Sequence, residues 1–319
     1  MTFSKNHVEM INKIERGQFF TVKNPFNNEG FLDWAKKCDL KNTTILEPFA
    51  GSNNLIEMLK DMDLCSHYQS YDIQPKSVNV KYKNTLEDFP QGFDCCITNP
   101  PYLAKNSATR KQIDVDMGCF DDLYKYSLSK CLKNCKHVGA IIPASFINAG
   151  IFRDRLSCYI LLTAKMFDDT DTPVCLALFD EFSSDAKIYE GSKFLGSLSE
   201  LEKKTPRANN TVRAKFNDSC GQLGLIAIDN TQGPTIRFCR GEEISADKIK
   251  VSSRSITRIE VGCKINDSKI QAINGLLDEY RRATYDVLMT PFKGIREDGK
   301  FRRRLDYALA DTMICKCFG

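Results

Sequence analysis

The chain has 319 residues, of which 42% are hydrophobic, and a formal net charge of +4. This length suggests about two domains with real cores, and no apolar run approaches the roughly 20 residues of a membrane span. Because the first residues, Met1 to Lys13, are polar and lack the apolar core of a signal peptide, we expect a cytoplasmic protein.

Fourteen cysteines are scattered along the chain without a secretory signal. This pattern predicts free buried thiols rather than a disulfide framework. Two closely spaced pairs, Cys131 with Cys135 and Cys315 with Cys317, are candidate metal ligands, but neither has a second pair at zinc-finger spacing. We therefore expect no metal site.

From residue 44 to about 180, short apolar runs alternate with segments of helical period. Strands are expected at 44–46, up to 72, at 78–82, 93–98, 138–142 and 174–179, and helices at 54–60 and 121–132. Such alternation predicts an α/β fold with a doubly wound, mostly parallel sheet. Ligands of such sheets bind beyond the carboxyl ends of the strands, so the residues that follow the strands are the candidate site.

The first strand ends in a turn of small residues, Glu47-Pro48-Phe49-Ala50-Gly51, that leads into a helix. Gly51 permits a ligand to approach the backbone closely, and Ser52 or Asn53 is expected to cap the helix. The turn lacks the G-x-G-x-x-G pattern and a Walker lysine, which argues against phosphate binding. The carboxylate of Glu47 suits a cationic ligand instead.

Asp72 ends the second strand about 25 residues later. A carboxylate at this position is well placed to accept hydrogen bonds from ribose hydroxyl groups. A helix cap is the alternative interpretation.

Residues 97–102 read Ile-Thr-Asn-Pro-Pro-Tyr and follow the expected strand at 93–98. Asn99 offers a side-chain carbonyl, Pro100 presents a backbone carbonyl without an N–H, and Tyr102 supplies a flat ring. Two acceptors beside a ring suit the exocyclic amine of a base. An ordinary Pro-Pro turn at the end of a strand is the alternative.

After about residue 182 the sequence becomes rich in Ser, Lys, Glu and Asn, and residues 200–210 are the most linker-like. Strand-like runs at 223–228, 235–239 and 258–262 precede a helix at 270–282, a basic loop and a short helix at 305–312. This predicts a second, smaller α+β domain. We expect domains at 1–185 and 190–319.

The basic excess lies in the second part, where residues 181–319 hold 24 Lys and Arg against 19 Asp and Glu. This is compatible with a nucleic-acid surface. The densest basic stretch comprises Lys293, Arg296, Lys300, Arg302, Arg303 and Arg304. A solvated loop and helix start is the alternative for this stretch.

Together, the loop at Glu47, the strand end at Asp72 and the Asn-Pro-Pro-Tyr motif resemble the gamma-class adenine-N6 DNA methyltransferases of restriction-modification systems. The resemblance covers residues 16 to about 180. It includes Arg16-Gly17-Gln18-Phe19-Phe20-Thr21, which is similar to the family's N-terminal cofactor motif, and the segments 122–126 and 138–148. The cofactor loop precedes the catalytic motif and the extra domain follows both, as in the gamma arrangement.

The resemblance implies a Rossmann-like methyltransferase sheet, S-adenosyl-L-methionine as cofactor and a base-flipping reaction. The implied catalytic residues are Asn99, Pro100, Pro101, Tyr102 and Phe167, with Phe167 facing Tyr102 across the flipped base; an ordinary core phenylalanine is the alternative for Phe167. The implied cofactor-binding residues are Phe20, Thr21, Glu47, Pro48, Ala50, Gly51, Asp72 and Asn84. Asn84 stands where the family often has an acidic residue, and it lies 15 residues before Asn99, whereas Asp88 lies only 11 before.

The implied function is site-specific transfer of a methyl group to adenine N6 in double-stranded DNA, within a type II restriction-modification system. A cognate restriction endonuclease acting on the same site is then a partner. The expected DNA contacts are Lys105, Arg110, Lys111, Lys293, Arg296, Arg302, Arg303 and Arg304. The alternatives are a protein glutamine-N5 or RNA base methyltransferase with the same motif, and a DNA-binding module without catalysis, which the intact catalytic positions disfavour.

Overall fold

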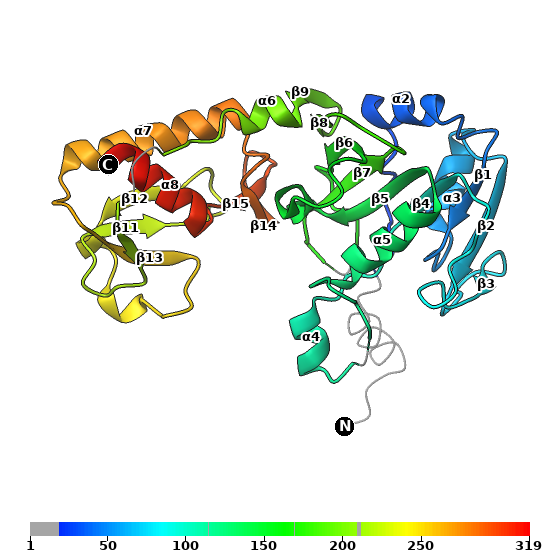
Figure 1. Ribbon diagram of the computed structural model, residues 1–319, viewed down its shortest axis with the longest axis horizontal. Coiled ribbons are helices and arrows are strands. Elements are labelled where there is room, and N and C mark those ends of the chain that lie inside the picture. The colour runs from blue at the N-terminus through cyan, green and yellow to red at the C-terminus, as the bar shows by residue number, and fades with distance from the viewer. Residues whose placement is uncertain (1–18, 114, 169, 209–211) are drawn as a thin grey trace. The chain divides into compact units, whose positions relative to one another are not determined.

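The computed structural model describes residues 19–113, 115–168, 170–208 and 212–319 (Figure 1). The chain divides into two compact units, Met1–Gly196 and Ser197–Gly319. Among the described residues, no helix combines the length and the apolar character that a membrane crossing needs.

The first unit is built on one nine-stranded sheet. Its strands, in spatial order, are β3 (Lys81–Tyr82), β2 (His67–Asp72), β1 (Thr44–Glu47), β4 (Cys95–Thr98), β5 (His137–Pro143), β7 (Val174–Phe179), β6 (Leu156–Leu161), β8 (Lys187–Glu190) and β9 (Lys193–Ser197). The strands from β3 to β5 pair in parallel, whereas β7 is antiparallel to both of its neighbours. This confirms the predicted α/β fold with a mostly parallel sheet.

Helices cover this sheet, and its central strands are therefore buried on both faces. The strands β4 and β7 are buried at every residue, which explains why both read as continuous apolar runs rather than as alternating ones. The helices of this unit are α2 (Glu29–Lys37), α3 (Asn54–Asp61), α4 (Lys105–Arg110), α5 (Leu123–Asn134) and the short η1 (Ala144–Ala149), of which α4 does not cover the sheet.

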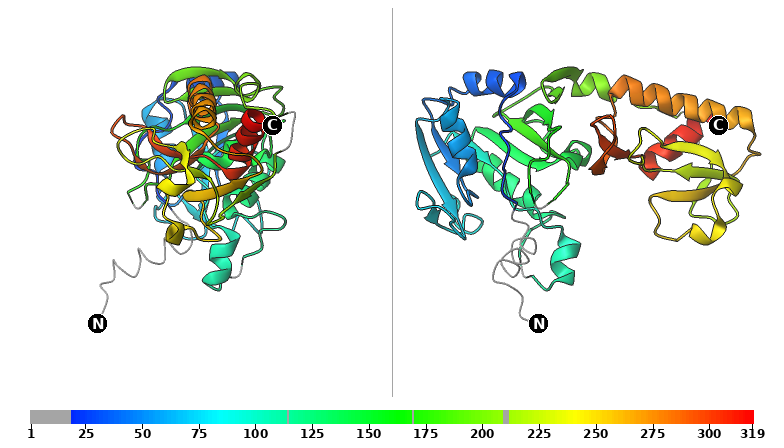
Figure 2. Two further views of the ribbon diagram at one scale, coloured as in Figure 1. Left: turned by 90° about the vertical axis from the view of Figure 1, so that its left-hand side faces the viewer. Right: turned by 180° about the vertical axis from the view of Figure 1, so that it is seen from behind.

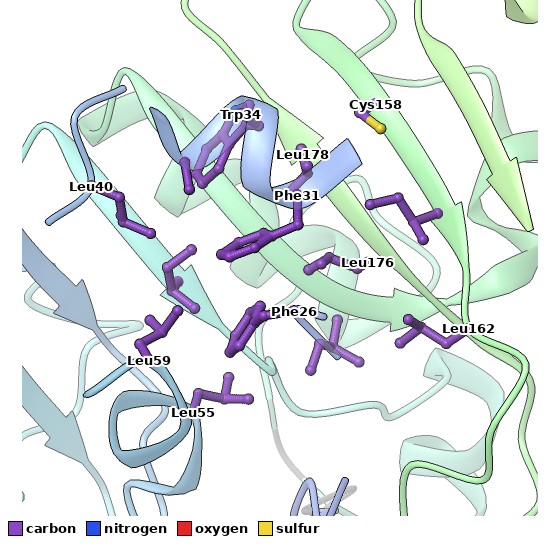
Figure 3. Packing of buried hydrophobic residues seen from close by; sticks show 14 of the residues in the cluster. Phe26, Phe31, Trp34, Leu40, Leu55, Leu59, Cys158, Leu162, Leu176 and Leu178 are labelled. Atoms are coloured by element: carbon purple, nitrogen blue, oxygen red, sulfur yellow. The ribbon is translucent and has the colours of Figure 1, made fainter. Parts of the chain in front are cut away.

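One core cluster joins α2 and α3 to the strands (Figure 3). In α2, Phe31 and Trp34 lie one turn apart and both belong to this cluster, which also includes Leu55 of α3 and Leu176 of β7. Asn28 caps α2, because its side chain accepts a hydrogen bond from the backbone N–H of Phe31 at 2.9 Å.

Several boundaries differ from the predictions. The strand expected at 78–82 is reduced to the two residues of β3, and the sheet continues past residue 185 through β8 and β9. Part of the expected linker is the helix α6 (Leu198–Glu202), which begins with a capping box between Ser197 and Glu200. The fourteen cysteines are free thiols and nine of them are buried, as predicted.

The second unit has an antiparallel sheet in the order β10 (Ala214–Phe216), β13 (Ile256–Val261), β11 (Leu223–Ile226) and β12 (Arg237–Arg240). Its other elements are η2 (Gly241–Glu243), η3 (Ala246–Lys248), α7 (Asp267–Thr284), the hairpin of β14 (Thr290–Ile295) and β15 (Phe301–Arg304), and α8 (Tyr307–Phe318). The core of this unit packs residues of the sheet, such as Phe238 and Ile259, against Leu277 of α7 and Ile314 of α8.

The basic stretch at 293–304 is this hairpin, and part of it is buried. Asp229 is fully buried and accepts hydrogen bonds from both terminal nitrogens of Arg281 at 2.9 Å and from Arg296 at 2.8 Å. Burial alone would raise the pKa of Asp229, but the hydrogen bonds from Arg281 hold it below its usual value. The network keeps a charge ionised inside the unit.

These positions correct the expected DNA contacts. Arg296 and Arg303 are only 5% and 2% exposed, so neither guanidinium is available to a phosphate. Arg302 donates to the backbone oxygen of Asp229 at 2.6 Å, and Arg304 pairs with Asp306. Of the five expected contacts here, only Lys293 is exposed.

We predict that Arg296→Ala destabilises the protein, because it leaves Asp229 with one fewer partner for a buried charge. The expected loss of unfolding free energy is about 3 to 5 kcal/mol, measured by chemical denaturation. Lys293→Ala, an exposed change in the same hairpin, is the control and should leave stability unchanged. Equal stability of the two variants would contradict a structural role for Arg296.

Candidate active site

The carboxyl ends of β1, β2 and β4 lie at one edge of the sheet, because β1 pairs in parallel with both neighbours. This places the residues that end or follow these strands, Glu47, Asp72 and Asn99, at the same edge. Beside them lies a cavity of about 720 Å³. Its lining includes Phe19, Phe20, Phe49, Gly51, Asp72, Asn84, Thr85, Leu86, Asn99, Pro101, Leu103 and Tyr126.

The loop after β1 is held in shape by Asp72. One carboxylate oxygen of Asp72 accepts a hydrogen bond from the N–H of Gly51 at 2.8 Å, and the other accepts one from Gln74 at 2.6 Å. Gly51 has a φ of +52°, and a Cβ there would lie 2.3 Å from the ring of Phe20. Both the conformation and the close packing therefore require glycine.

The N-cap residue of α3 is Asn53, one of the two predicted residues, but its side chain makes no capping hydrogen bond. Its oxygen instead accepts from the hydroxyl of Ser70 at 2.6 Å, and its nitrogen donates to Glu57 at 3.3 Å. Asn53 therefore ties α3 to β2.

Glu47 is a buried carboxyl group at the rim of a second, small cavity of about 20 Å³, which Thr21, Ala50 and Asn99 also line. Burial raises the pKa of Glu47 to about 8, although hydrogen bonds from Thr98 at 2.7 Å and from the N–H of Phe49 at 3.1 Å favour the ionised form. A cationic group nearby would favour ionisation further. The site therefore suits a ligand with a positive charge.

The carboxamide of Asn99 is held at both ends. Its Nδ2 donates to the backbone oxygen of Phe19 at 2.6 Å, and its Oδ1 lies 2.8 Å from the hydroxyl of Tyr102. That hydroxyl also lies 2.6 Å from the backbone oxygen of Ile141, so two acceptors share its single hydrogen. These contacts fix which end of the amide is the acceptor.

The rings of Tyr102 and Phe167 contact each other edge to face, with centroids 6.0 Å apart. Phe167 is 1% exposed and lies in the segment between β6 and β7. Neither ring lines the two cavities, and neither does Pro100. Burial raises the pKa of Tyr102 well above its usual value.

The other expected cofactor residues lie around the same loop. Asn84 lines the large cavity, and its side chain accepts from the N–H of Leu86 at 3.3 Å, whereas Asp88 is exposed and paired with Lys83. Pro48 lines neither cavity; its backbone oxygen accepts from Thr85 at 2.8 Å. The first part of the N-terminal motif, residues 16–18, lies outside the described residues.

Some residues of the site were not predicted. Thr98 holds Glu47, and Asp122 accepts from the N–H groups of Leu103 and Tyr124, both at 3.2 Å, which joins the catalytic motif to α5. The sequence signal for Asp122 was its position as a polar residue just before a helix. Nothing in the sequence indicated the contact between Thr98 and Glu47.

Lys105, Arg110 and Lys111 belong to α4 and its C-terminal end, and all three are exposed. Figures 1 and 2 show that α4 projects from the first unit. Ala104 and Asp122, which flank the segment that contains α4, form an isolated antiparallel β-bridge.

In the described parts of the chain, no three His, Cys, Asp or Glu residues are grouped so that they could hold a metal ion.

The sheet of the first unit has the strand order β3-β2-β1-β4-β5-β7-β6, with β7 antiparallel. The site lies at the carboxyl ends of its strands, where ligands of such sheets bind. Residues 10–166, just under half of the chain, match the family of the Eco57I restriction-modification methylase.

Three solved structures illustrate the similarity, each at low identity. A Listeria monocytogenes protein described as a class I S-adenosylmethionine-dependent methyltransferase is 13% identical, with a TM-score of 0.36, and the alignment covers 59% of this chain and 72% of that chain. The methyltransferase subunit of a type I restriction-modification system from Streptococcus thermophilus is 17% identical, with a TM-score of 0.36 and coverage of 59% and 54%. The M protein of the type I restriction enzyme EcoKI is 11% identical, with a TM-score of 0.35 and coverage of 77% and 68%. No curated protein sequence matches this chain at a significant level.

We predict that Glu47 makes the stability of the cofactor-free protein fall as pH rises from about 4.5 to about 8. In this window the unfolded chain has lost the proton of Glu47 whereas the folded chain keeps it, so the contribution is about 1.4 kcal/mol per pH unit. Glu47→Gln keeps the neutral shape and should remove this part of the slope in denaturation measured from pH 4 to pH 9. An unchanged slope in Glu47→Gln would contradict the raised pKa.

Proposed function

We propose that the protein is a site-specific adenine-N6 DNA methyltransferase that uses S-adenosylmethionine. One observation carries the proposal: the carboxamide of Asn99 borders the same cavity as Gly51, Asp72 and Asn84. An acceptor for a substrate amine and a set of groups suited to an adenosyl cofactor therefore share one continuous space.

The residues around the cavity fit this cofactor. A volume of about 720 Å³ lies in the range of small-molecule sites. Asp72 and Asn84 are acceptors that suit ribose hydroxyls and the amino group of adenine. Glu47, a buried carboxyl group with a raised pKa, suits the positively charged methionine end, and Thr21 and Ala50 line the same small cavity.

The amine of adenine is a poor nucleophile, because its lone pair is delocalised into the ring. Asn99 Oδ1 and the backbone carbonyl of Pro100 would accept its two N–H groups and favour a more pyramidal nitrogen with a localised lone pair. When bound, S-adenosylmethionine supplies an electrophilic methyl group on a sulfonium sulfur and leaves as a neutral thioether. The lone pair of the amine forms the N–C bond as the C–S bond breaks, and the methylated amine then releases one proton to water, while Asn99 Oδ1 acts throughout as a hydrogen-bond acceptor.

The side chains of Pro101, Tyr102 and Phe167 would hold the base next to Asn99. Adenine N6 is paired inside a duplex, so the base has to be flipped out at a cost of a few kcal/mol. Stacking on Tyr102 and Phe167 recovers part of this cost. No side-chain nucleophile is needed, because positioning provides most of the rate increase.

We assign DNA recognition to the second unit, with Lys105, Arg110 and Lys111 of the first unit contacting phosphates near the flipped base. The buried Arg296 and Arg303 have no part in this. A type II restriction-modification system, with an endonuclease that acts on the same site, is the proposed setting.

We predict that labelled S-adenosylmethionine transfers its methyl group to unmethylated DNA and that the label is found on adenine. Release factor and ribosomal RNA are the comparison substrates, because enzymes with the same four-residue motif modify glutamine or RNA bases. Label on protein or RNA, with none on DNA, would contradict the proposal.

We predict that Asn99→Ala lowers the turnover number by at least about 100-fold, because the substrate amine loses an acceptor in the transition state. Binding of S-adenosylmethionine, measured by calorimetry, should persist. Asn79→Ala, an exposed asparagine of the same unit, is the matched control and should have wild-type turnover. Near-normal turnover of Asn99→Ala would refute the role of this residue.

A further inference from the structure

The rings of Phe19, Tyr102 and Phe167 form a three-membered cluster. The centroid of Phe19 lies 5.8 Å from each of the other two, with interplanar angles of 37° and 39°. Tyr102 and Phe167 are themselves 6.0 Å apart at 72°. A base sandwiched between two parallel rings needs them about 7 Å apart, twice the about 3.4 Å of one stacking step. The slot for the base is therefore closed, and Phe19 packs against both of its walls.

The backbone of Phe19 has a separate contact, with the predicted catalytic amide. Its carbonyl oxygen accepts from Asn99 Nδ2 at 2.6 Å. If the carboxamide turned over, Oδ1 would face this carbonyl, and two acceptors would repel each other. The carbonyl of Phe19 therefore keeps Oδ1 of Asn99 as the group that is presented to an amine.

The residues after Phe19 are tied to three parts of the site. Asn54 donates to the backbone oxygen of Thr21 at 2.8 Å, and the N–H of Val22 donates to the backbone oxygen of Met166 at 2.9 Å. Phe20 packs on Gly51. The backbone is thus anchored, whereas the half-buried ring of Phe19 borders both cavities, which leaves space for the ring to turn about its Cα–Cβ bond.

We infer that Phe19 is a positioning residue of the target-base site. Its carbonyl orients Asn99, and its ring packs against Tyr102 and Phe167, which contact each other, and so keeps the base site closed until DNA binds. When the flipped adenine enters, the ring of Phe19 turns into the cavity, and the base takes over its contacts with the two other rings. The inference rests on the proposed function and adds a residue whose side chain opposes base entry while its backbone supports catalysis.

The test compares wild type with Phe19→Ala on a duplex that carries the target site, which is first identified from methylated DNA. Flipping is measured by permanganate oxidation of the thymine left unpaired opposite the target adenine, and turnover by methyl transfer. Phe19→Ala should increase thymine oxidation and lower the KM for DNA by about 3- to 10-fold, the size expected for one or two aromatic contacts. The kcat should stay the same, because the carbonyl remains.

Phe182→Ala, which removes a ring of the same unit that is 72% exposed, is the matched control and should behave as wild type. Phe19→Leu provides a second variant if Phe19→Ala does not fold, and the same direction of change is expected. Unchanged or reduced thymine oxidation, or a higher KM, would overturn the inference and make Phe19 part of the surface that binds the base. A wild-type protein without adenine methylation would instead refute the proposed function.

Discussion

The parallel pairing of β1 with both β2 and β4 is the constraint on which the site depends. Ile45 pairs with Tyr68 on one side and with Cys95 on the other, so the chain after each of these strands leaves the sheet at the same edge. The loop at Gly51, the carboxylate of Asp72 and the amide of Asn99 are far apart in the sequence and meet only because of this register. A shift of one strand by one residue would also turn its buried side chains to the opposite face.

Two buried carboxyl groups of this protein, Asp229 and Glu47, have opposite surroundings. In the second unit, Asp229 is neutralised by Arg281 and Arg296, and its pKa is held below the usual value. In the first unit, Glu47 accepts hydrogen bonds from the hydroxyl of Thr98 and the N–H of Phe49 but forms no ion pair with a described residue, and its pKa is raised. The first arrangement stabilises a fold, whereas the second is costly in the folded protein unless a positively charged ligand binds. The contrast distinguishes Asp229, which has a structural role, from Glu47, to which we assign the binding of a ligand.

Most of the sheet could be predicted from the sequence, because a strand that is buried on both faces, such as 174–179, reads as an unbroken apolar run. The places of Asp72 and Asn99 in the site could also be predicted, because ligands of such sheets bind beyond the carboxyl ends of the strands. The burial of Arg296 and Arg303 could not be predicted, because it depends on Asp229, which is distant in the sequence and meets them only in the folded unit. The position of Phe19 was missed for a similar reason: its motif indicated a cofactor contact, but its carbonyl bond to Asn99 spans 80 residues.

The central claim is that Asn99 holds the amine of a flipped adenine next to the cofactor cavity. Sequencing modified bases in DNA from cells that express this chain, or its Asn99→Ala variant, tests this claim most directly. We predict N6-methyladenine at one short recognition sequence in cells with the wild-type chain and none at that sequence in cells with the variant. Methylation of cytosine alone, or the same adenine methylation with both chains, would contradict it.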